Sequence, residues 1–322
     1  MNSGEIYFNA DQTNIKRRTY LCDMEGLPPS SLWIDFEKTG HNRQAKYELL
    51  DIMPEDVFDT PKPTKLIKYI INLVDNNKKA IVLDFFSGSG TTADSIMQLN
   101  AEDDGKRKYI LVQLPENLDE GLEKASNDNK TVIKNAINLC ESKDVPHELS
   151  EIAKERIRRA GDKIKAEHPD ADIDIGFKVF RTADTNIKWN SLMDMGQIDM
   201  NQLEYTPDLV DFMPDANDVD VVYELMLRQR DVALSETLEQ LSDIGSRTYL
   251  YASSYLVCLE TQITEELVGK LAELDPLPIK FIFRDSAFKD DIALKDETFR
   301  RLKALIEKNA GTNKPTYTVE FI

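Results

Sequence analysis

Cysteine and histidine are scarce in this chain, and both shortages narrow the chemistry that it can carry. Its three cysteines lie far apart, without the close pairs of a zinc site or the even number of a disulfide framework. Its three histidines show no metal-ligand spacing. We therefore expect reduced cysteines and no metal site. The residues concerned are Cys22, Cys140, Cys258, His41, His147 and His168.

Positive charge and long apolar runs are also lacking. Against 58 Asp and Glu the chain has 40 Lys and Arg, a net charge of −18. This balance argues against a basic surface that binds DNA or an anionic membrane unaided. No run approaches the roughly 18 apolar residues that a membrane span needs, and residues 1–18 lack the features of a signal peptide. We expect a cytoplasmic protein with no membrane partner.

The composition is that of a globular chain, with 41% hydrophobic and 30% charged residues and only 13 Gly and 13 Pro. Its 322 residues correspond to two domains at about 150 residues each. Residues 191–217 are rich in Asp, Asn, Met and Pro and show little periodicity, which predicts a linker.

Hydrophobic periodicity predicts alternating strands and helices before this linker. Residues 1–50 read as loops and short strands, and residues 64–74 as an amphipathic helix. The pattern then gives strands at 80–86, 109–114 and 176–181, and helices at 91–100 and 152–166. Strands that alternate with helices indicate a parallel sheet with right-handed crossovers.

A small α+β domain is predicted after the linker. Its expected strands are residues 248–251, 255–259, 279–284 and 317–322, and its expected helices are 220–230, 265–274 and 296–308.

The most informative stretch is Asp84-Phe85-Phe86-Ser87-Gly88-Ser89-Gly90-Thr91-Thr92. Glycines between a buried strand and a helix let backbone N–H groups approach a ligand at the helix N-terminus. Such a turn suits a nucleotide-like molecule, although a tight turn without a ligand would use the same residues.

This stretch, read as Phe-x-Gly-x-Gly with an Asp two residues before the Phe, resembles the S-adenosylmethionine motif of amino-methyltransferases that act on DNA. Upstream, residues 58–63 with Leu66 and Ile67 resemble the segment of these enzymes that packs against the methionine end of the cofactor. Downstream, residues 108–116 resemble the second strand, whose end meets the adenosine ribose. Gln113 stands where many relatives have an acidic residue.

The later part of the chain resembles one group of these enzymes, the modification subunits of type III restriction systems, which methylate adenine at N6. The resemblance runs from about Trp33 onward and rests on residues 152–160, 176–180, 185–186, 189, 285–291 and 294–295. It implies S-adenosylmethionine as cofactor. The implied partners are DNA through the complete enzyme, a restriction subunit, and a second modification subunit or an N-terminal half.

The fold implied is α/β: a partial Rossmann-like sheet of an S-adenosylmethionine-dependent methyltransferase, followed by a small α+β domain. The implied domains are residues 1–50, the end of a target-recognition or connecting region; 51–190, the cofactor-binding half; 191–217, the linker; and 218–322, an interaction domain.

One motif of the family is missing. These enzymes hold the target amine with Asp/Asn/Ser-Pro-Pro-Tyr/Phe, which pairs a hydrogen-bonding oxygen with a ring that stacks on the flipped base. Residues 27–30 and 275–278 are the nearest matches, and neither of them offers the polar residue and the aromatic ring together. We therefore expect a C-terminal piece of a longer enzyme, inactive alone. In the parent fold the motif's strand pairs with residues 81–86, so we expect another copy, the missing half or residues 5–36 to cover that edge.

The resemblance assigns eleven cofactor-binding residues and no catalytic residue. Each has a simpler reading: the prolines bracket a helix entry, Asp84 caps the turn, and Phe86 packs in the core. Arg156 and its neighbours Arg158 and Arg159 read as a solvated face rather than a DNA contact. The eleven are Thr60, Pro61, Lys62, Pro63, Asp84, Phe86, Gly88, Gly90, Thr91, Thr92 and Gln113.

Two functions remain open. The first is the cofactor-binding part of an adenine-N6 DNA methyltransferase. The second is a non-catalytic interaction module that docks restriction or modification subunits, which the missing tetrapeptide favours. A dinucleotide oxidoreductase is excluded because the turn is not Gly-x-Gly-x-x-Gly and no acidic residue ends the second strand.

Overall fold

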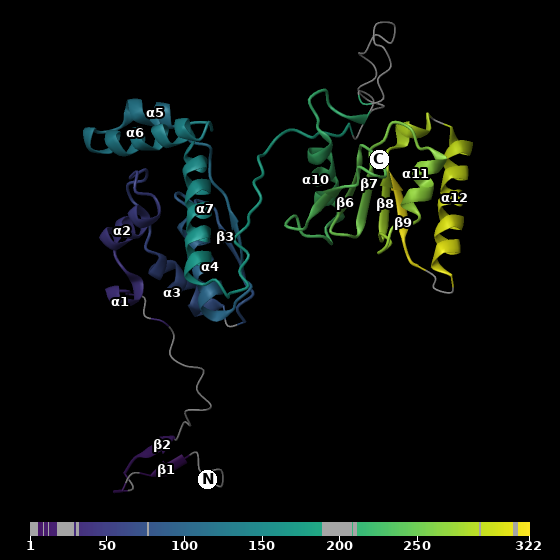
Figure 1. Cartoon of the computed structure of the whole chain (residues 1–322). Helices are drawn as coiled ribbons and strands as arrows, with labels where there is room; N and C mark the ends of the chain where they lie inside the picture. The colour runs from purple at the N-terminus through teal and green to yellow at the C-terminus, as the bar shows by residue number, and fades with distance from the viewer. Residues whose placement is uncertain are drawn as a thin grey trace. The chain divides into compact units, whose positions relative to one another are not determined.

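The computed structural model describes residues 6–8, 10–11, 13–17, 29, 32–75, 77–188, 208, 211–289, 291–311 and 315–322. The chain divides into two compact units, Met1–Gly176 and Phe177–Ile322, each of which is described by itself (Figure 1). Most of the predicted linker, residues 191–207, 209 and 210, lies outside the described residues, as does Trp189.

The first unit alternates helices with two short parallel strands. Its helices are α1 (Phe36–Thr39), α2 (Asn42–Ile52), α3 (Thr64–Val74), α4 (Thr91–Asp103), α5 (Leu118–Lys124), α6 (Asn127–Ser142) and α7 (Leu149–Glu167). Its strands are β3 (Ile81–Asp84) and β4 (Lys108–Leu111), and an antiparallel pair is formed by β1 (Ile6–Phe8) and β2 (Ile15–Arg17).

Strands β3 and β4 lie parallel, with Val82 opposite Tyr109, and α4 is the crossover between them. One face of this sheet is covered, because Val82 and Tyr109 pack against Ile71 of α3 and Ile96 of α4. Burial raises the pKa of the Tyr109 hydroxyl to about 12. The parallel register of β3 and β4 and the bounds of α3 confirm the predicted parallel pairing and the predicted helix at 64–74.

The opposite face of the same sheet carries large apolar side chains that are exposed. Ile81 is 66% exposed and Leu83 48%, and Ile110 on the neighbouring strand is 52% exposed. Parallel strands are normally covered on both faces. In the described part of the chain, β4 is also the one strand that pairs with β3, so the other edge of β3 has no strand partner.

The prediction of loops and short strands for residues 1–50 is wrong for residues 36–39, which form α1, and for residues 42–50, which belong to α2. Asp35 accepts a hydrogen bond from Glu37 N and caps α1, and His41 Nδ1 accepts one from Gln44 N and caps α2. The apolar face of α2 packs into a core with α6 and α7. The side-chain caps of α1 and α2 and the apolar face of α2 therefore stabilise helices in this part of the chain.

The predicted third strand at 176–181 is also wrong, because these residues pair with no strand in the described chain. Lys178 and Phe180, which belong to the second unit, contact helix α10 (Asp218–Gln229) of that unit instead. Lys178 Nζ donates to the Tyr223 hydroxyl at 2.8 Å, and the Phe180 ring meets the Tyr223 ring edge to face. The alternating pattern here serves packing on a helix, not a sheet.

The second unit is a mixed five-stranded sheet with helices on both faces. Its strands, in spatial order, are β5 (Leu238–Gln240), β6 (Thr248–Tyr251), β7 (Tyr255–Cys258), β8 (Lys280–Phe283) and β9 (Thr318–Phe321). The first three are antiparallel neighbours and the last three are parallel. Its other helices are α11 (Glu265–Leu271), α12 (Ile292–Ala310) and a short 3₁₀ helix at Asp285–Phe288.

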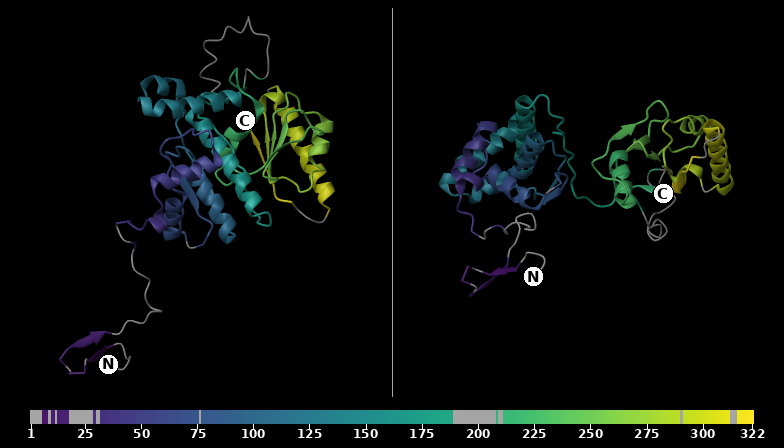
Figure 2. Two further views of the ribbon diagram at one scale, coloured as in Figure 1. Left: turned by 60° about the vertical axis from the view of Figure 1, so that its left-hand side comes forward. Right: turned by 90° about the horizontal axis from the view of Figure 1, so that it is seen from below.

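Figures 1 and 2 show this sheet between α10 on one side and the pair α11 and α12 on the other. Alternate residues of β7 and β8 divide between the layers: Val257 and Ile282 face α10, whereas Leu256 and Phe281 face α11 and α12. All helices and strands predicted after the linker are present.

None of the helices in the described ranges combines the length and the apolar character that a membrane span requires.

Candidate functional site

The glycine turn connects the end of β3 to the start of α4, as the sequence predicts. Gly88 and Gly90 both have positive φ, +52° and +80°, which glycine adopts without the strain of a side chain. Gly90 N donates to Ser87 O at 2.8 Å and closes the turn. Gly90 is also the N-cap of α4 and forms no side-chain cap, so the turn leads into a helix N-terminus without a side-chain acceptor.

The two glycines face different neighbours. A Cβ at Gly90 would lie 3.1 Å from Ile157 Cγ1 and 3.3 Å from Ala153 O, both on α7. A Cβ at Gly88 would lie 3.4 Å from Phe58 Cζ, an ordinary contact. Gly90 is thus required by close packing on α7, whereas Gly88 lies where the turn meets the segment at residues 58–63.

Helix α2 holds this segment at both ends. Lys46 Nζ donates to Phe58 O at 2.6 Å, and Glu48 Oε2 accepts from Thr64 N and Thr64 Oγ1 at 3.1 and 3.0 Å. Between these anchors Pro61 and Pro63 are buried, and Thr60 and Lys62 are exposed. The prolines serve as the helix entry; Thr60 and Lys62 are the two candidates in the segment whose side chains reach solvent.

Asp84 at the end of β3 caps the turn, as its simpler reading predicts. Its Oδ1 accepts from Phe86 N at 3.1 Å, and its Oδ2 accepts from Thr92 Oγ1 at 2.6 Å. Phe86 is 85% exposed, so the reading of its ring as core is wrong. Each carboxylate oxygen keeps further acceptor capacity.

Gln113 contacts the glycine turn directly. Its Oε1 accepts from Gly88 N at 2.8 Å, and its Nε2 donates to Leu114 O at 3.2 Å. The structure thus brings three stretches that are far apart in sequence together at Gly88: residues 58–63, the turn itself and the end of the second strand.

Arg156 is a site residue that sequence reasoning missed. Its side chain is fully buried and its Nη1 donates to Ser89 Oγ and Thr91 Oγ1 at 2.8 and 2.7 Å, while its Nη2 donates to Asp94 Oδ2 at 2.9 Å. The solvated-face reading is wrong for this residue. The signal was present: Arg156 stands at i+4 from Ile152 and i−4 from Ala160, in the middle of the apolar face of α7.

Helix α7 also holds the chain just before residues 58–63. Arg159 donates from Nη1 and Nη2 to both carboxylate oxygens of Glu55, each at 2.9 Å. This pair of hydrogen bonds lowers the pKa of Glu55 against the opposing effect of burial. One helix therefore supports both the turn and the connection that leads into the segment.

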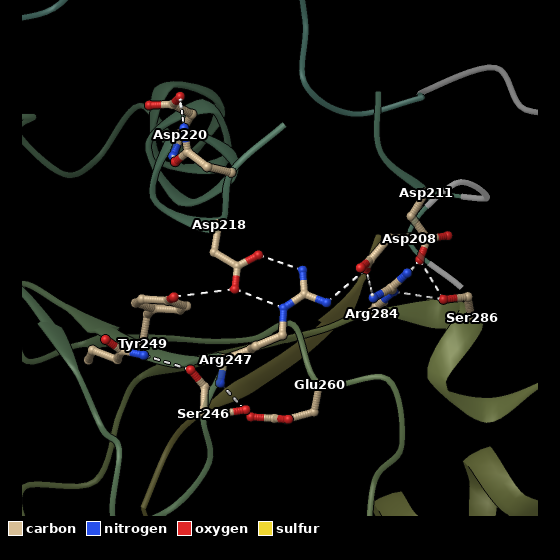
Figure 3. A network of polar contacts seen from close by, with 12 residues as sticks. Asp208, Asp211, Asp218, Asp220, Ser246, Arg247, Tyr249, Glu260, Arg284 and Ser286 are labelled. Atoms are coloured by element: carbon tan, nitrogen blue, oxygen red, sulfur yellow. Dashed lines mark hydrogen bonds and ion pairs between the residues drawn. The ribbon is translucent and has the colours of Figure 1, made fainter. Parts of the chain in front are cut away.

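A second polar cluster lies in the second unit, at the carboxyl ends of β7 and β8 (Figure 3). Asp208 Oδ1 lies between two guanidinium groups and accepts from Arg247 Nη1 at 2.7 Å and from Arg284 Nη1 at 2.6 Å. Burial raises the pKa of Asp208, but these hydrogen bonds lower it overall. Asp218 completes the pairing of Arg247 at the start of α10.

This cluster joins residues 208, 211 and 218 to the sheet and is explained by that structural role. Asp211 also accepts from Arg284 Nε, and the Arg284 guanidinium lies 4.9 Å from the centre of the Phe212 ring. Within the described residues, His, Cys, Asp and Glu side chains form no group of three or more suited to hold a metal.

The comparison with family models gives one match, which lies within the first unit. Residues 5–123 match the model described as DNA methylase, and all eleven predicted cofactor-binding residues lie inside this match. Over residues 5–123 the chain is similar to the N6/N4 DNA methylase family.

The chain is also homologous over part of its length to type III modification subunits. It is 38% identical over 179 residues to the type III restriction-modification enzyme StyLTI Mod subunit of Salmonella typhimurium, which covers 55% of this chain and 24% of that protein. The EcoPI Mod subunit of Escherichia phage P1 is 34% identical over 169 residues, which cover 52% and 23%.

A third relative comes from a different type of system. The type II methyltransferase M.KpnI of Klebsiella pneumoniae is 38% identical over 96 residues, which cover 30% of this chain and 22% of that enzyme. The chain matches about a quarter of the length of each of these relatives. The predicted resemblance to DNA amino-methyltransferases and to type III modification subunits is confirmed at this level.

Proposed function

We propose that this chain is the S-adenosylmethionine-binding part of a site-specific adenine-N6 DNA methyltransferase of a type III restriction-modification system. The observation that carries the proposal is the meeting of three motifs at Gly88. The Phe58 ring lies within contact of the position of a Gly88 Cβ, and Gln113 Oε1 accepts from Gly88 N at 2.8 Å.

The donors and acceptors around the turn fit this cofactor. The N-terminus of α4 has no side-chain cap and offers a favourable environment for a carboxylate. Asp84, with acceptor capacity left beside its two local hydrogen bonds, is placed to meet an ammonium group. Gln113 can hydrogen-bond a ribose hydroxyl, and the exposed Phe86 ring can contact an adenine. When bound, the cofactor supplies the methyl group that is transferred.

Titration calorimetry of the full chain with S-adenosylmethionine tests the proposal. We expect saturable one-to-one binding, with S-adenosylhomocysteine as a competitor and NAD without effect. Absence of binding at millimolar cofactor, with a folded protein in the cell, would overturn the assignment.

The same proposal predicts that the purified chain alone transfers no methyl group to DNA. It contains no Asp/Asn/Ser-Pro-Pro-Tyr/Phe tetrapeptide to hold the adenine amine, and its net charge of −18 opposes DNA binding. A radiolabelled methyl-transfer assay on duplex and single-stranded DNA measures this, with a complete adenine methyltransferase as the positive control. Turnover by the purified chain would show that another loop holds the base.

Catalysis is therefore assigned to a complete cytoplasmic enzyme in which this chain works with a restriction subunit and with a second modification subunit or the remaining methyltransferase half.

The bare face of the β3–β4 sheet specifically favours the alternative of a docking module. Ile81, Leu83 and Phe85 expose apolar surface there, Ile110 lies opposite Leu83, and Val112 and Leu114 farther along the chain are exposed as well. Covering it would stabilise a complex by roughly 25 cal/mol for each Å² of apolar area.

Backbone hydrogen bonds define which amides report on the open edge. Lys108 N donates to Ala80 O and Val112 N donates to Asp84 O, so even-numbered residues of β3 point toward β4. The odd-numbered Leu83 and Phe85 point their N–H groups toward the open edge. Within the segment 5–36, Trp33 contacts α3, where its ring meets the Tyr69 ring with ring centres 5.4 Å apart.

We predict that this edge is covered in solution by another copy of the chain or by the remaining methyltransferase half. Hydrogen exchange at low and high protein concentration measures the coverage. If copies cover the edge, the Leu83 and Phe85 amides gain protection as concentration rises while the Val112 amide, bonded within the sheet, serves as the internal control. Rapid exchange of Leu83 and Phe85 in every oligomeric state and in complex would contradict the prediction.

A further inference from the structure

Helix α7 lies directly behind the glycine turn and contributes a charged group to it. Arg156 and Asp94 form an ion pair at 2.9 Å in which both side chains are shielded from solvent. Such a pair carries a large desolvation cost and is weak evidence for stability by itself. The arrangement therefore calls for a role beyond holding α7 against α4.

The guanidinium nitrogen that does not bind Asp94 suggests that role. This nitrogen, Nη1, donates to Ser89 Oγ and to Thr91 Oγ1, the two hydroxyl groups on either side of Gly90. Ser89 and Thr91 are both buried. A planar guanidinium with fixed donors can hold two acceptors and a carboxylate in one geometry, which a lysine ammonium cannot do.

The next residue continues the network to the end of β3. The Thr92 hydroxyl donates to Asp84 Oδ2 at 2.6 Å, and Gly90 N donates to Ser87 O. Each residue from Ser87 to Thr92 is therefore held by a contact within the protein, and Gly88 N donates to the side chain of Gln113.

We propose that Arg156 is a positioning residue for the cofactor turn. By holding Ser89 and Thr91 it fixes the direction of the backbone N–H groups at the start of α4 before a ligand arrives, so less ordering remains to be done on binding. The inference rests on the proposed function, because it concerns the affinity of the same site. Arg156 lies outside residues 5–123, so the family match does not assign it.

A double variant separates positioning from stability. Arg156→Met with Asp94→Leu removes both buried charges together, which avoids an unpaired charge, and leaves Ser89 and Thr91 without their donor. We expect the affinity for S-adenosylmethionine, measured by calorimetry, to fall about tenfold or more, and the Gly88 to Thr92 amides of the ligand-free protein to exchange faster.

A matched control removes another buried pair of the same unit. Arg107→Met with Asp75→Leu acts at the opposite end of α4, where Arg107 Nε donates to Asp75 Oδ2 at 2.7 Å. Its melting temperature can be compared directly with that of the Arg156 and Asp94 variant, and its cofactor affinity should stay that of the parent chain.

Cofactor affinity decides the outcome. Equal affinity in the parent chain and the Arg156 and Asp94 variant overturns the positioning role, whereas a parent chain that binds no cofactor overturns the proposed function instead. If the double variant does not fold, Thr91→Val is used in its place, since it removes one acceptor of Arg156 and leaves the ion pair intact. Unchanged affinity and unchanged amide exchange in Thr91→Val would then refute the inference.

Discussion

Gly88→Val is expected to abolish all S-adenosylmethionine binding that calorimetry detects. Gly88 has φ +52°, a conformation that costs a β-branched residue about 1–2 kcal/mol, and its N–H is a donor at the meeting point of the three motifs. The Val methyl groups would extend from a Cβ that already lies 3.4 Å from the Phe58 ring. They would fill the space in which a ligand has to approach the backbone.

Two further glycine variants make this result specific. Gly90→Ala places its Cβ 3.1 Å from Ile157 and 3.3 Å from a backbone oxygen, so we expect it to lower the melting temperature as well as the affinity. Gly121→Ala on α5 meets no atom within 4 Å and should change neither. If Gly88→Val binds the cofactor like the parent chain, the glycine turn is not the binding site.

The glycine turn and the helices and strands next to it in sequence were predictable because local rules determine them. Helix α3 was predicted with its observed bounds, since apolar residues recur at helical spacing after two prolines that fix its start. The parallel pairing of β3 and β4 follows from the strand, turn and helix between them. That residues 58–63 and Gln113 meet at Gly88 was expected only through the family resemblance, because nothing local determines it.

What could not be predicted depends on long-range contacts. The position of Arg156 on the apolar face of α7 indicates burial, but its acceptors come from residues 89, 91 and 94, which no local pattern brings to α7. Lys46 and Glu48 likewise gain their roles from residues 58 and 64. The pattern at 176–181 was misread as a strand because alternation does not reveal whether the partner is a strand or a helix.

Removing one partner of the buried ion pair between Arg107 and Asp75 is expected to destabilise the first unit far more than removing one partner of an exposed pair nearby. Arg107 Nε donates to Asp75 Oδ2 at 2.7 Å, with the side chains 1% and 2% exposed, and its other nitrogens donate to Asp103. These bonds link the ends of α3 and α4 to the start of β4. Arg107→Met leaves Asp75 charged and without its guanidinium partner, which should cost about 3–5 kcal/mol.

Native-state hydrogen exchange of the Val112 amide measures this loss within the first unit, because that amide donates to Asp84 O at 2.8 Å across the β3–β4 sheet. We expect its protection to fall by roughly two to four powers of ten. Lys106→Met is the matched control: Lys106 pairs with Asp172 at the same 2.7 Å, but the two side chains are 53% and 95% exposed. Water screens that pair, so its removal should leave Val112 protection within the error of the measurement. Equal effects of the two variants would show that burial does not decide the strength of these pairs, and that Arg107 does not link the helices to the sheet.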